Sequence, residues 1–582
     1  MKQINRRTFL KESGLWVASG LALPLFLKPW LPPAGAPTPD AGSPATPAAP
    51  TAYQLQTPHQ VLMMDLSNSD FAARFTQLAN QGYRPIWFQG TANGPGAATY
   101  SAIWIRDGAG PWYEWHDMTA AGYQTNFDNY AAQGYRPISV SGYQNGGANQ
   151  FGAVWLYLPG VGYSGIHNAS SAQYQTFVNN NITAGNMPQV VDGYAVGSSP
   201  GASDDYISIW AATTSYPWEA RHGLTSADYQ TFFNTYTSQG YHATCLSAYQ
   251  INGVTYFAAF MVKDAVSDWF GRHDYLPGDL YNQAVSGVQN DYQPTVIEGY
   301  DSGSTRNFAG VWIKKARSWT TTGAYNPNLA SFDNAVQSFM QARNIPGGSL
   351  AVTKDSRLVY ARGYRWDGYT TDPVNPDTLF RIASVTKPLT SMAVMRLVQE
   401  NTLHLTDKLV NLLALPAPLD TRMNDITLLE LLQHQGGWNR DTTFDPMFYD
   451  QTIASAQGVS LPISQQNIID YMTTKHMLDF TPGTMYNYSN YGFLLLGRII
   501  EAVTHLPYAT YMQNAVFGPL GISRIVLGAS EFEFRKAGEA TYFTANPGLF
   551  ANMRQAGAPA NVMAQYGNFN IENMDSHGGF LA

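Results

Sequence analysis

The feature that most constrains this chain is a short motif that returns five times between residues 55 and 320. The copies follow one another at intervals of 51 to 55 residues. They begin at Gly82, Gly134, Gly185, Gly240 and Asp291. Self-similarity at a fixed period indicates equivalent structural units that pack on their neighbours, so the sequence predicts a tandem array instead of one irregular core.

Each copy carries the signals of a helix followed by a hairpin. Aromatic and aliphatic residues precede the glycine at helical spacing, as in Phe71, Phe75 and Leu78, and the glycine then ends the helix. Alternating runs on either side of a Gly/Asn-rich turn such as QNGGANQ, residues 144–150, predict a two-stranded hairpin. We therefore expect a domain at residues 53–322 made of helix-strand-strand units, with neighbouring units pairing into one continuous sheet.

A large aromatic residue recurs at one fixed place after each motif. These residues are Trp104, Trp155, Trp210, Phe260 and Trp312. Such a residue either packs in the core of its unit or forms a stacking platform for sugars, and a fixed place in every unit favours the core. The repeats carry no catalytic or metal-binding motif. We expect them to act as a spacer or to bind an unidentified polymer or protein.

The N-terminus is typical of an export signal. Paired arginines, Arg6 and Arg7, precede an apolar stretch at 15–27, and the pattern resembles a twin-arginine signal peptide. We expect a signal at residues 1–36, a Pro/Ala-rich linker at 37–52, and an extracytoplasmic or secreted protein with no stable transmembrane segment after cleavage. An uncleaved membrane anchor is the alternative, although the apolar stretch is short for a span.

Composition excludes several classes of function. The formal net charge is −8 at pH 7, which argues against a nucleic-acid partner. The single cysteine, Cys245, excludes an internal disulfide and a cysteine-based metal cluster, and its apolar surroundings predict a buried, inert thiol. We expect neither a metal nor another cofactor.

The sequence changes character after residue 326, where the repeat ends. We expect a helix at 329–343 and a hairpin at 347–364. Ser384 and Lys387 then stand three residues apart at the start of a helix, which places both side chains on one face. A buried lysine of lowered pKa can activate a serine hydroxyl, but a serine at a helix start is also a common capping residue.

Two further motifs favour the catalytic interpretation. Tyr488 and Asn490 lie in a Tyr-x-Asn sequence between a Pro-Gly turn and an apolar helix, and SHGGF at 576–580 follows near the end. With the Ser-x-x-Lys sequence, these motifs are similar to those of class C β-lactamases and their esterase and peptidase relatives. The resemblance covers residues 328–582, whereas the layout of the whole chain resembles that of polyglycine hydrolases.

The resemblance implies roles for the matching residues. Ser384 is the nucleophile, Lys387 and Tyr488 share the proton transfers, and Asn490 positions substrate or Lys387. Which of Lys387 and Tyr488 is the general base stays open. The Ser384 amide forms half of an oxyanion hole.

The third motif implies the substrate-binding side of the cleft. His577, Gly579 and Phe580 belong to a strand beside the nucleophile, and the Phe580 amide is the second oxyanion donor. A histidine suits a β-lactam carboxylate less well than a lysine, which favours peptides or esters. His434, in LLQHQGG, is interpreted as structural.

We therefore expect an α+β protein: a repeat domain followed by a β-lactamase-like domain with an antiparallel sheet, flanking helices and an all-helical part. The expected function is an exported serine hydrolase with a Ser-Lys-Tyr acyl-enzyme mechanism. Its substrate is a peptide, glycine-rich or containing D-amino acids, or an ester. The alternatives are a weakly active or inactive binding protein that uses the repeats, and a true β-lactamase.

One expectation concerns the end of the sequence. In the family that it resembles, further strands and a closing helix follow the third motif, so we expect a truncated catalytic domain. The strand at His577 would then be a bare edge, and the helix at 329–343 would lose a partner for its apolar face.

Overall fold

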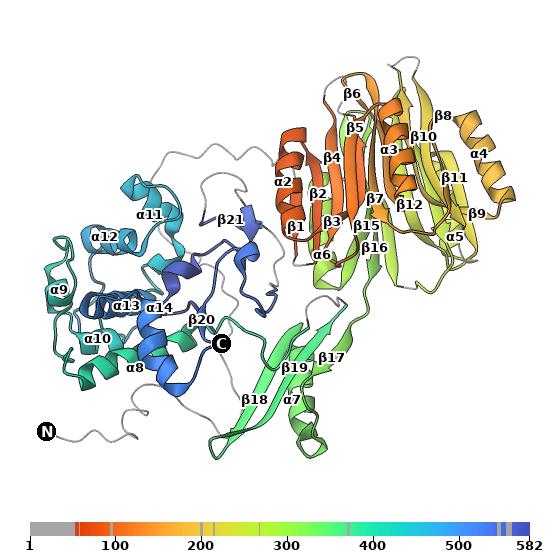
Figure 1. Ribbon diagram of the computed structural model, residues 1–582. Helices are drawn as coiled ribbons and strands as arrows, with labels where there is room; N and C mark the ends of the chain where they lie inside the picture. The colour runs from red at the N-terminus through yellow and green to blue at the C-terminus, as the bar shows by residue number, and fades with distance from the viewer. Residues whose placement is uncertain are drawn as a thin grey trace.

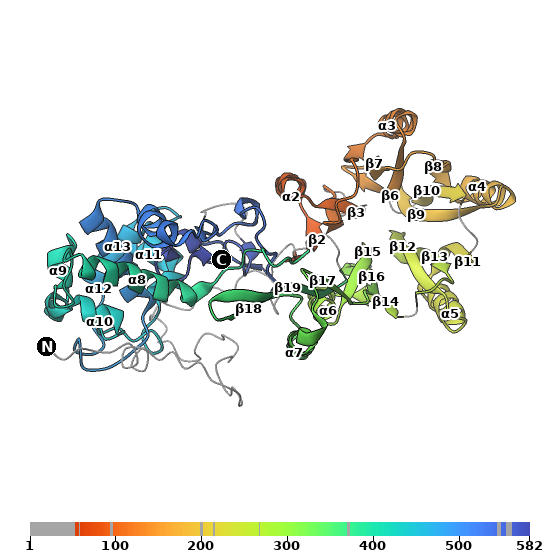
Figure 2. The same ribbon diagram turned by 60° about the horizontal axis from the view of Figure 1, so that its bottom comes forward.

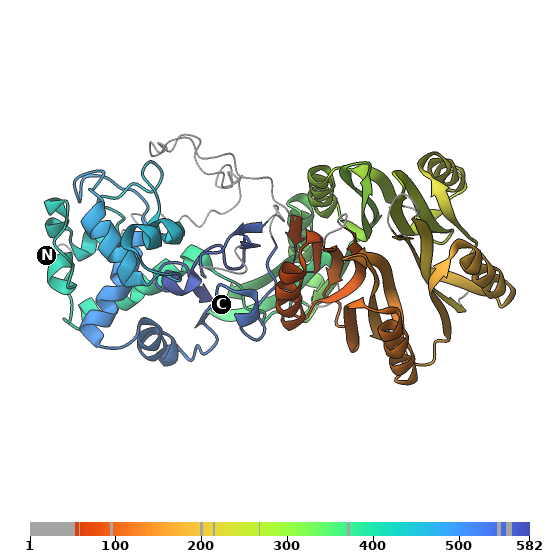
Figure 3. The same cartoon turned by 90° about the horizontal axis from the view of Figure 1, so that it is seen from above.

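The structure is a computed structural model. It describes residues 53–57, 59–92, 97–197, 202–212, 216–266, 268–368, 373–543, 549–554 and 561–582. The expected signal at 1–36 and linker at 37–52 lie outside the described residues. Two parts lie end to end, an N-terminal array of small sheets and a C-terminal part of helices and short strands (Figures 1 and 3). The predicted α+β class is confirmed.

The second unit shows how each repeat is built. Its elements are β5 (Trp112–Met118), α3 (Ala120–Ala132), β6 (Tyr135–Asn145) and β7 (Ala148–Tyr157). The strands form one antiparallel sheet in the order β5-β7-β6. Gly146 and Gly147 turn the hairpin with φ of 60° and 80°, a conformation that glycine adopts without strain. The predicted helix and hairpin are confirmed, and an outer strand precedes the helix.

The other units repeat this order of elements. The first has β1 (Tyr53–Gln56), β2 (Gln60–Leu66), α2 (Asn68–Asn80), β3 (Arg84–Thr91) and β4 (Thr99–Ile105). The third has β8 (Tyr163–Ser170), α4 (Ser171–Thr183), β9 (Asn186–Val196) and β10 (Ser203–Ala212). The fourth has β11 (Trp218–Thr225), α5 (Ser226–Thr237), β12 (His242–Ile251) and β13 (Val254–Val262). The fifth has β14 (Trp269–Tyr275), α6 (Pro277–Gln289), β15 (Tyr292–Ser302) and β16 (Thr305–Lys314).

The five sheets close into a ring. Each inner strand packs beside the next in the order β3, β6, β9, β12 and β15, and β15 returns to β3. Figure 2 shows β6, β9 and β12 towards the centre, with α3, α4 and α5 at the periphery. The prediction of one continuous sheet is wrong, because the strands of neighbouring units belong to separate sheets.

Side chains, instead of a backbone ladder, join neighbouring sheets. Each inner strand places one buried polar residue at the same position. These residues are Gln89, Ser141, Asp192, Ser247 and Glu298. Asp192 accepts hydrogen bonds from the Gly142 amide at 2.9 Å and the Ser247 hydroxyl at 2.6 Å, one from each neighbouring unit. Burial raises the pKa of Asp192 to about 6.

Apolar contacts between units follow a second regular pattern. The Tyr194 ring of one inner strand lies directly on Gly142 of the strand before it, and Tyr143 and Tyr249 lie in the same way on Gly90 and Gly193. The recurrent Trp104, Trp155, Trp210 and Trp312 are fully buried, and Phe260 nearly so. The interpretation of these residues as core is confirmed. Cys245 is buried, as predicted, and burial raises its pKa.

The C-terminal part begins with a sheet that the repeats help to form. β17 (Ser318–Thr322), within the span expected for the repeat domain, pairs with β19 (Arg357–Asp367), and β19 pairs with β18 (Gly347–Lys354). α7 (Ala330–Ala342) packs on this sheet, as the amphipathic pattern at 329–343 predicts.

Helices make up most of the remainder. They include η2 (Ala383–Val385), α8 (Thr386–Gln399), α9 (Leu409–Leu412), α10 (Leu428–Leu432), α11 (Asp450–Gln457), α12 (Gln465–Lys475), α13 (Asn490–Thr504), α14 (Tyr508–Tyr511) and η8 (Ile571–Met574). The short strands are β20 (Val526–Leu527), β21 (Leu549–Ala551), β22 (Asn561–Met563) and β23 (Phe580–Leu581). Ten residues of α13 are buried, which makes it the central helix.

The strand that follows His577 is not a bare edge, contrary to the expectation. β23 pairs with β20 on one side. On the other side, Phe380 and Ala582 exchange two backbone hydrogen bonds of 2.9 and 3.0 Å. In the part of the chain that the structure describes, no helix combines the length and apolarity needed to cross a bilayer.

The packing of tyrosine on glycine generates a prediction for the ring. A Cβ at Gly142 would lie 2.3 Å from the Tyr194 ring, so Gly142→Ala should force the two units apart. We expect a loss of about 1–3 kcal/mol of unfolding free energy, the usual cost of overpacking. Chemical denaturation followed by tryptophan fluorescence measures it. Gly110→Ala is the matched control, because nothing lies within 4 Å of a Cβ there. Equal stability of the two variants would contradict this account of the ring.

Candidate active site

Ser384 stands at a sharp change of backbone direction. The segment at 379–381, which makes two isolated β-bridges, leads toward η2, and Ala383 takes a φ of 45°, an uncommon conformation for a residue with a side chain. α8 follows at once. The turn leaves Ser384 exposed at the start of the helix, while Lys387, one turn later, is buried.

Lys387 joins three segments that are distant in sequence. Its Nζ lies 2.7 Å from Asn490 Oδ1, 2.9 Å from the carbonyl oxygen of His577 and 3.2 Å from Ser384 Oγ. The Tyr488 ring lies against the same amine, with its centroid 4.6 Å away. The side chains that the sequence singled out as Ser-x-x-Lys and Tyr-x-Asn therefore meet around one nitrogen atom.

The surroundings of Lys387 favour its neutral form. The residue is only 4% exposed, and burial lowers its pKa to about 7. A neutral amine has two hydrogens and one lone pair. Asn490 Oδ1 and the His577 carbonyl can only accept, so they take the two hydrogens. The lone pair is then left for Ser384 Oγ, which is the orientation that a general base needs.

Tyr488 lies on the other side of the serine hydroxyl. Its OH donates to Ser384 Oγ at 2.6 Å, and burial raises its pKa, so the phenol keeps its proton. His434 supports this loop: its Nδ1 accepts the Ser489 amide at 3.0 Å and its ring lies 4.6 Å from that of Tyr488. Burial and the nearby Lys387 lower the pKa of His434 to about 4. His434 thus has partners, which sequence reasoning did not foresee.

Two charged residues of the site escaped sequence reasoning. Asp445 Oδ2 accepts from Asn490 Nδ2 at 2.7 Å, which turns the amide oxygen of Asn490 toward Lys387. Arg440 lies 3.4 Å from Asp445 and 5.3 Å from the centroid of the Tyr488 ring. Asp445 also caps a short 3-10 helix at Pro446–Phe448. Its Asp-Pro sequence therefore has the appearance of an ordinary cap.

The third motif is arranged differently from the expectation. His577 lies in a turn after η8, not in a strand, and it is 2% exposed. Its carbonyl, not its imidazole, contacts Lys387. Burial lowers the pKa of His577 well below 6.5, which keeps the ring neutral.

The residues after His577 pack inward. The Phe580 amide donates to the buried Thr386 hydroxyl at 3.4 Å, and its ring packs on Phe517. The role of the Phe580 amide as an oxyanion donor stays a prediction. The carbonyl of Gly579 accepts the Gly528 amide at 2.9 Å, which ties the motif to the segment beside β20.

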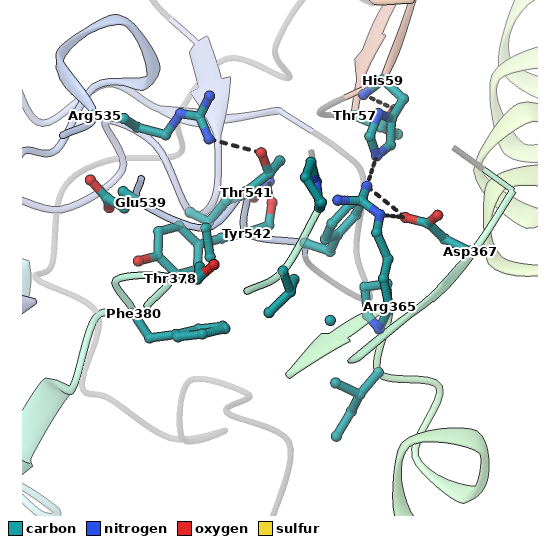
Figure 4. A pocket seen from close by; sticks show the side chains of 18 of the residues that line it. Thr57, His59, Arg365, Asp367, Thr378, Phe380, Arg535, Glu539, Thr541 and Tyr542 are labelled. Carbon is teal, nitrogen blue, oxygen red and sulfur yellow. Dashed lines mark hydrogen bonds and ion pairs between the residues drawn. The ribbon is translucent and has the colours of Figure 1, made fainter. Parts of the chain in front are cut away.

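A separate cavity of about 1000 Å³ lies where the two parts meet. Ser384 is not among its lining residues, whereas Phe380 is. In Figure 4, the Arg365 side chain lies between His59 of the ring and Asp367. Its Nη2 lies 3.4 Å from His59 Nε2, and its Nε donates to Asp367 Oδ2 at 2.8 Å. These contacts join the ring to the β17-β19-β18 sheet. Among the described residues, no cluster of His, Cys, Asp and Glu could hold a metal ion.

Both parts of the chain match known families. Residues 332–569 match the family model described as Beta-lactamase. Five segments match the model described as Polyglycine hydrolase-like, structural repeat; they are residues 61–107, 109–156, 160–211, 215–264 and 286–315.

Three curated relatives each match part of the chain. The chain is 40% identical over 153 residues to "Probable fimbrial assembly protein FimD, serogroup H1" of Dichelobacter nodosus, covering 26% of this chain and 36% of that protein. It is 29% identical over 194 residues to "Putative D-alanyl-D-alanine carboxypeptidase" of Escherichia coli O157:H7, covering 31% and 43%. It is 28% identical over 229 residues to "D-aminopeptidase" of Gluconobacter oxydans (strain 621H), covering 36% and 40%.

The chain thus spans 36% to 43% of the length of these relatives. The two family models together match segments of both the N-terminal and the C-terminal part. Residues 332–569 form a Beta-lactamase domain, and five copies of the Polyglycine hydrolase-like structural repeat precede it.

Proposed function

We propose that this protein is an exported serine hydrolase that forms an acyl-enzyme on Ser384. One observation carries the proposal: a buried lysine amine lies 2.7 and 2.9 Å from two carbonyl oxygens and 3.2 Å from the serine hydroxyl. A serine that only caps a helix needs no such partner. A structural lysine would be expected to pair with a carboxylate, not to lie among carbonyl groups with a lowered pKa.

Lys387 is the general base in this mechanism. As Ser384 Oγ bonds to the substrate carbonyl carbon, its proton passes to Lys387 Nζ. Collapse of the tetrahedral intermediate breaks the bond to the leaving group, which takes a proton through the Tyr488 hydroxyl. Water then attacks the acyl-enzyme by the same steps in reverse order. Tyr488 serves as a relay, because its raised pKa disfavours the phenolate that a tyrosine base would need.

We infer that the substrate is a peptide in which the scissile bond is flanked by glycine or D-amino acids. Two relatives bear the names of D-peptide hydrolases, and the repeats match a polyglycine hydrolase-like model. Glycine and D-residues share the absence of an L side chain at the α-carbon, so one cleft can accept both. The neutral, buried His577 offers no charge for a β-lactam carboxylate, which supports a peptide over an antibiotic.

Export is proposed from the twin-arginine pattern at Arg6 and Arg7. Peptides with D-residues or long glycine runs occur in cell walls and in extracellular proteins, so this location agrees with the proposed substrate. Signal-dependent appearance of the protein outside the cytoplasm, lost in an Arg6→Lys, Arg7→Lys variant, tests the proposal separately from catalysis.

Removal of each catalytic group should give a distinct result. Ser384→Ala should abolish the acyl-enzyme, and Lys387→Ala and Tyr488→Phe should each slow acylation by on the order of 10²–10⁴-fold, the usual contribution of a proton-transfer group. Fluorophosphonate labelling measures the reactivity of Ser384. Intact mass spectrometry measures the rate of acyl-enzyme formation on a panel of glycine-rich, D-alanyl and ester substrates. Tyr486→Phe is the matched control, because this exposed tyrosine of the same loop has no hydrogen bond to Ser384. Unchanged acylation by Tyr488→Phe would remove its proposed role.

The pH profile distinguishes the two candidate bases. Acylation should rise with pH through about 7, where Lys387 loses its proton. The charge of Arg440 lowers the pKa of Lys387 and that of Asp445 raises it, so Arg440→Gln should move the midpoint up and Asp445→Asn should move it down. We expect shifts of roughly half a pH unit or more. Asparagine keeps an acceptor for Asn490. A midpoint above pH 9 would identify Tyr488 as the base, and shifts in one common direction would contradict the assignment.

A further inference from the structure

The second repeat unit carries a cluster of aromatic rings on its outer surface. Trp115 is 50% exposed, Tyr157 42% and Tyr113 39%, and the cluster continues inward through Tyr130 and Tyr135. The Tyr113 and Tyr130 rings stack at 4.5 Å, Tyr135 lies 5.0 Å from Tyr113, and Tyr157 lies 5.3 Å from Tyr135. We call these five residues the aromatic platform.

The platform is held in one arrangement before any partner binds. The Trp115 indole N–H donates to the Tyr130 hydroxyl at 2.7 Å, which fixes the most exposed ring to α3. Tyr130 in turn packs on the fully buried Trp155 at 5.2 Å. Rigid aromatic side chains lose little conformational entropy on binding, so such a surface is already prepared for a ligand.

The fold itself does not require these exposed rings. Each unit has a residue of positive φ at the bulge of its outer strand, which identifies equivalent positions around the ring. Two residues before it, the five units have Met63, Trp115, Ile166, Arg221 and Arg272. The other four units form the same sheet without a tryptophan at this position, so the sheet does not need Trp115 in order to fold. The exposed rings of the second unit have some role other than folding.

The surroundings of the platform are polar but carry little charge. α3 contains Asp128 as its one charged residue, and the adjacent α4 contains none; both are rich in Asn, Gln and Thr. Among the described residues, no ion pair or cation–π contact involves the five rings. Exposed aromatic faces beside amides and hydroxyls complement pyranose rings, which present C–H faces for stacking and hydroxyls for hydrogen bonds. The two helices therefore offer almost no charge to a charged partner.

The position of the platform leaves it accessible. The C-terminal part contacts the first and fifth units: Phe532 lies 6.4 Å from Tyr83, and Arg317 and Asp291 line the shared cavity. In Figure 2 the second unit, with α3, lies away from the C-terminal part. Ser384 and the platform are therefore separate sites on one molecule.

We propose that the aromatic platform binds a glycan chain by stacking on its sugar rings, independently of the hydrolase site. The proposal does not depend on the proposed function, since it concerns a different surface. Its occupant is a polysaccharide of uncharged or weakly charged pyranose units.

The test uses the full chain and insoluble glycans. Chitin, cellulose and protein-free peptidoglycan are the probes in a co-sedimentation assay. We expect binding to at least one of them, and Trp115→Ala with Tyr157→Ala should weaken that binding at least tenfold, because stacking depends on the exposed ring faces. Trp115→Phe, which keeps a smaller ring, should give an intermediate loss.

Two controls keep the result interpretable. Tyr216→Ala removes a tyrosine that is 51% exposed but lies outside the platform, and it should leave binding unchanged. The unfolding temperature of the double variant and its acylation rate on a soluble substrate should equal those of the wild type. Absence of binding to all three glycans, or equal binding by the double variant, would overturn the proposal. A platform whose loss changes only self-association would be an interface between copies, which also overturns it.

Discussion

The burial of one amine governs the candidate active site of this protein. Lys387 is surrounded by Asn490 at the start of α13, by Tyr488 in the loop before that helix, by the carbonyl of His577 and by Ser384. Among the residues that the structure describes, no carboxylate bonds to it directly. Asp445 acts one residue further away, through Asn490, so that it orients the amide without holding Lys387 in the charged form. The low pKa of the lysine follows from this arrangement.

The ring depends on a different balance between backbone and side chains. The backbone hydrogen bonds of the strand ladders join strands of the same unit. Polar side chains such as that of Asp192, and close contacts such as that of the Tyr194 ring with Gly142, hold neighbouring units together. Because the inner strands make these contacts, the outward-facing residues of each unit can vary from one unit to the next without loss of the fold. The aromatic platform of the second unit is such a variation.

The two parts share structure and are not joined only by a linker. β17 leaves the last repeat and pairs with β19 of the C-terminal sheet, while Arg365 of β19 reaches back to His59 of the first unit. Contacts therefore run from the first and last units of the ring to the same sheet. That arrangement ties ring closure to the position of the C-terminal part, since both ends of the repeat array meet there.

The sequence by itself determined the local features. Helical spacing predicted that Ser384 and Lys387 share a face, the period of the motif predicted five units, and the fixed place of Trp155 and its equivalents predicted a core. These features follow from the spacing of residues along the chain, which can be read directly from the sequence. Only the tertiary structure decided the closure into a ring, the inward packing of Phe580, and the role of Asp445, whose local signal is that of a helix cap. Each of these depends on which distant segments come into contact, and that is set by the packing of whole elements and not by the spacing of neighbouring residues.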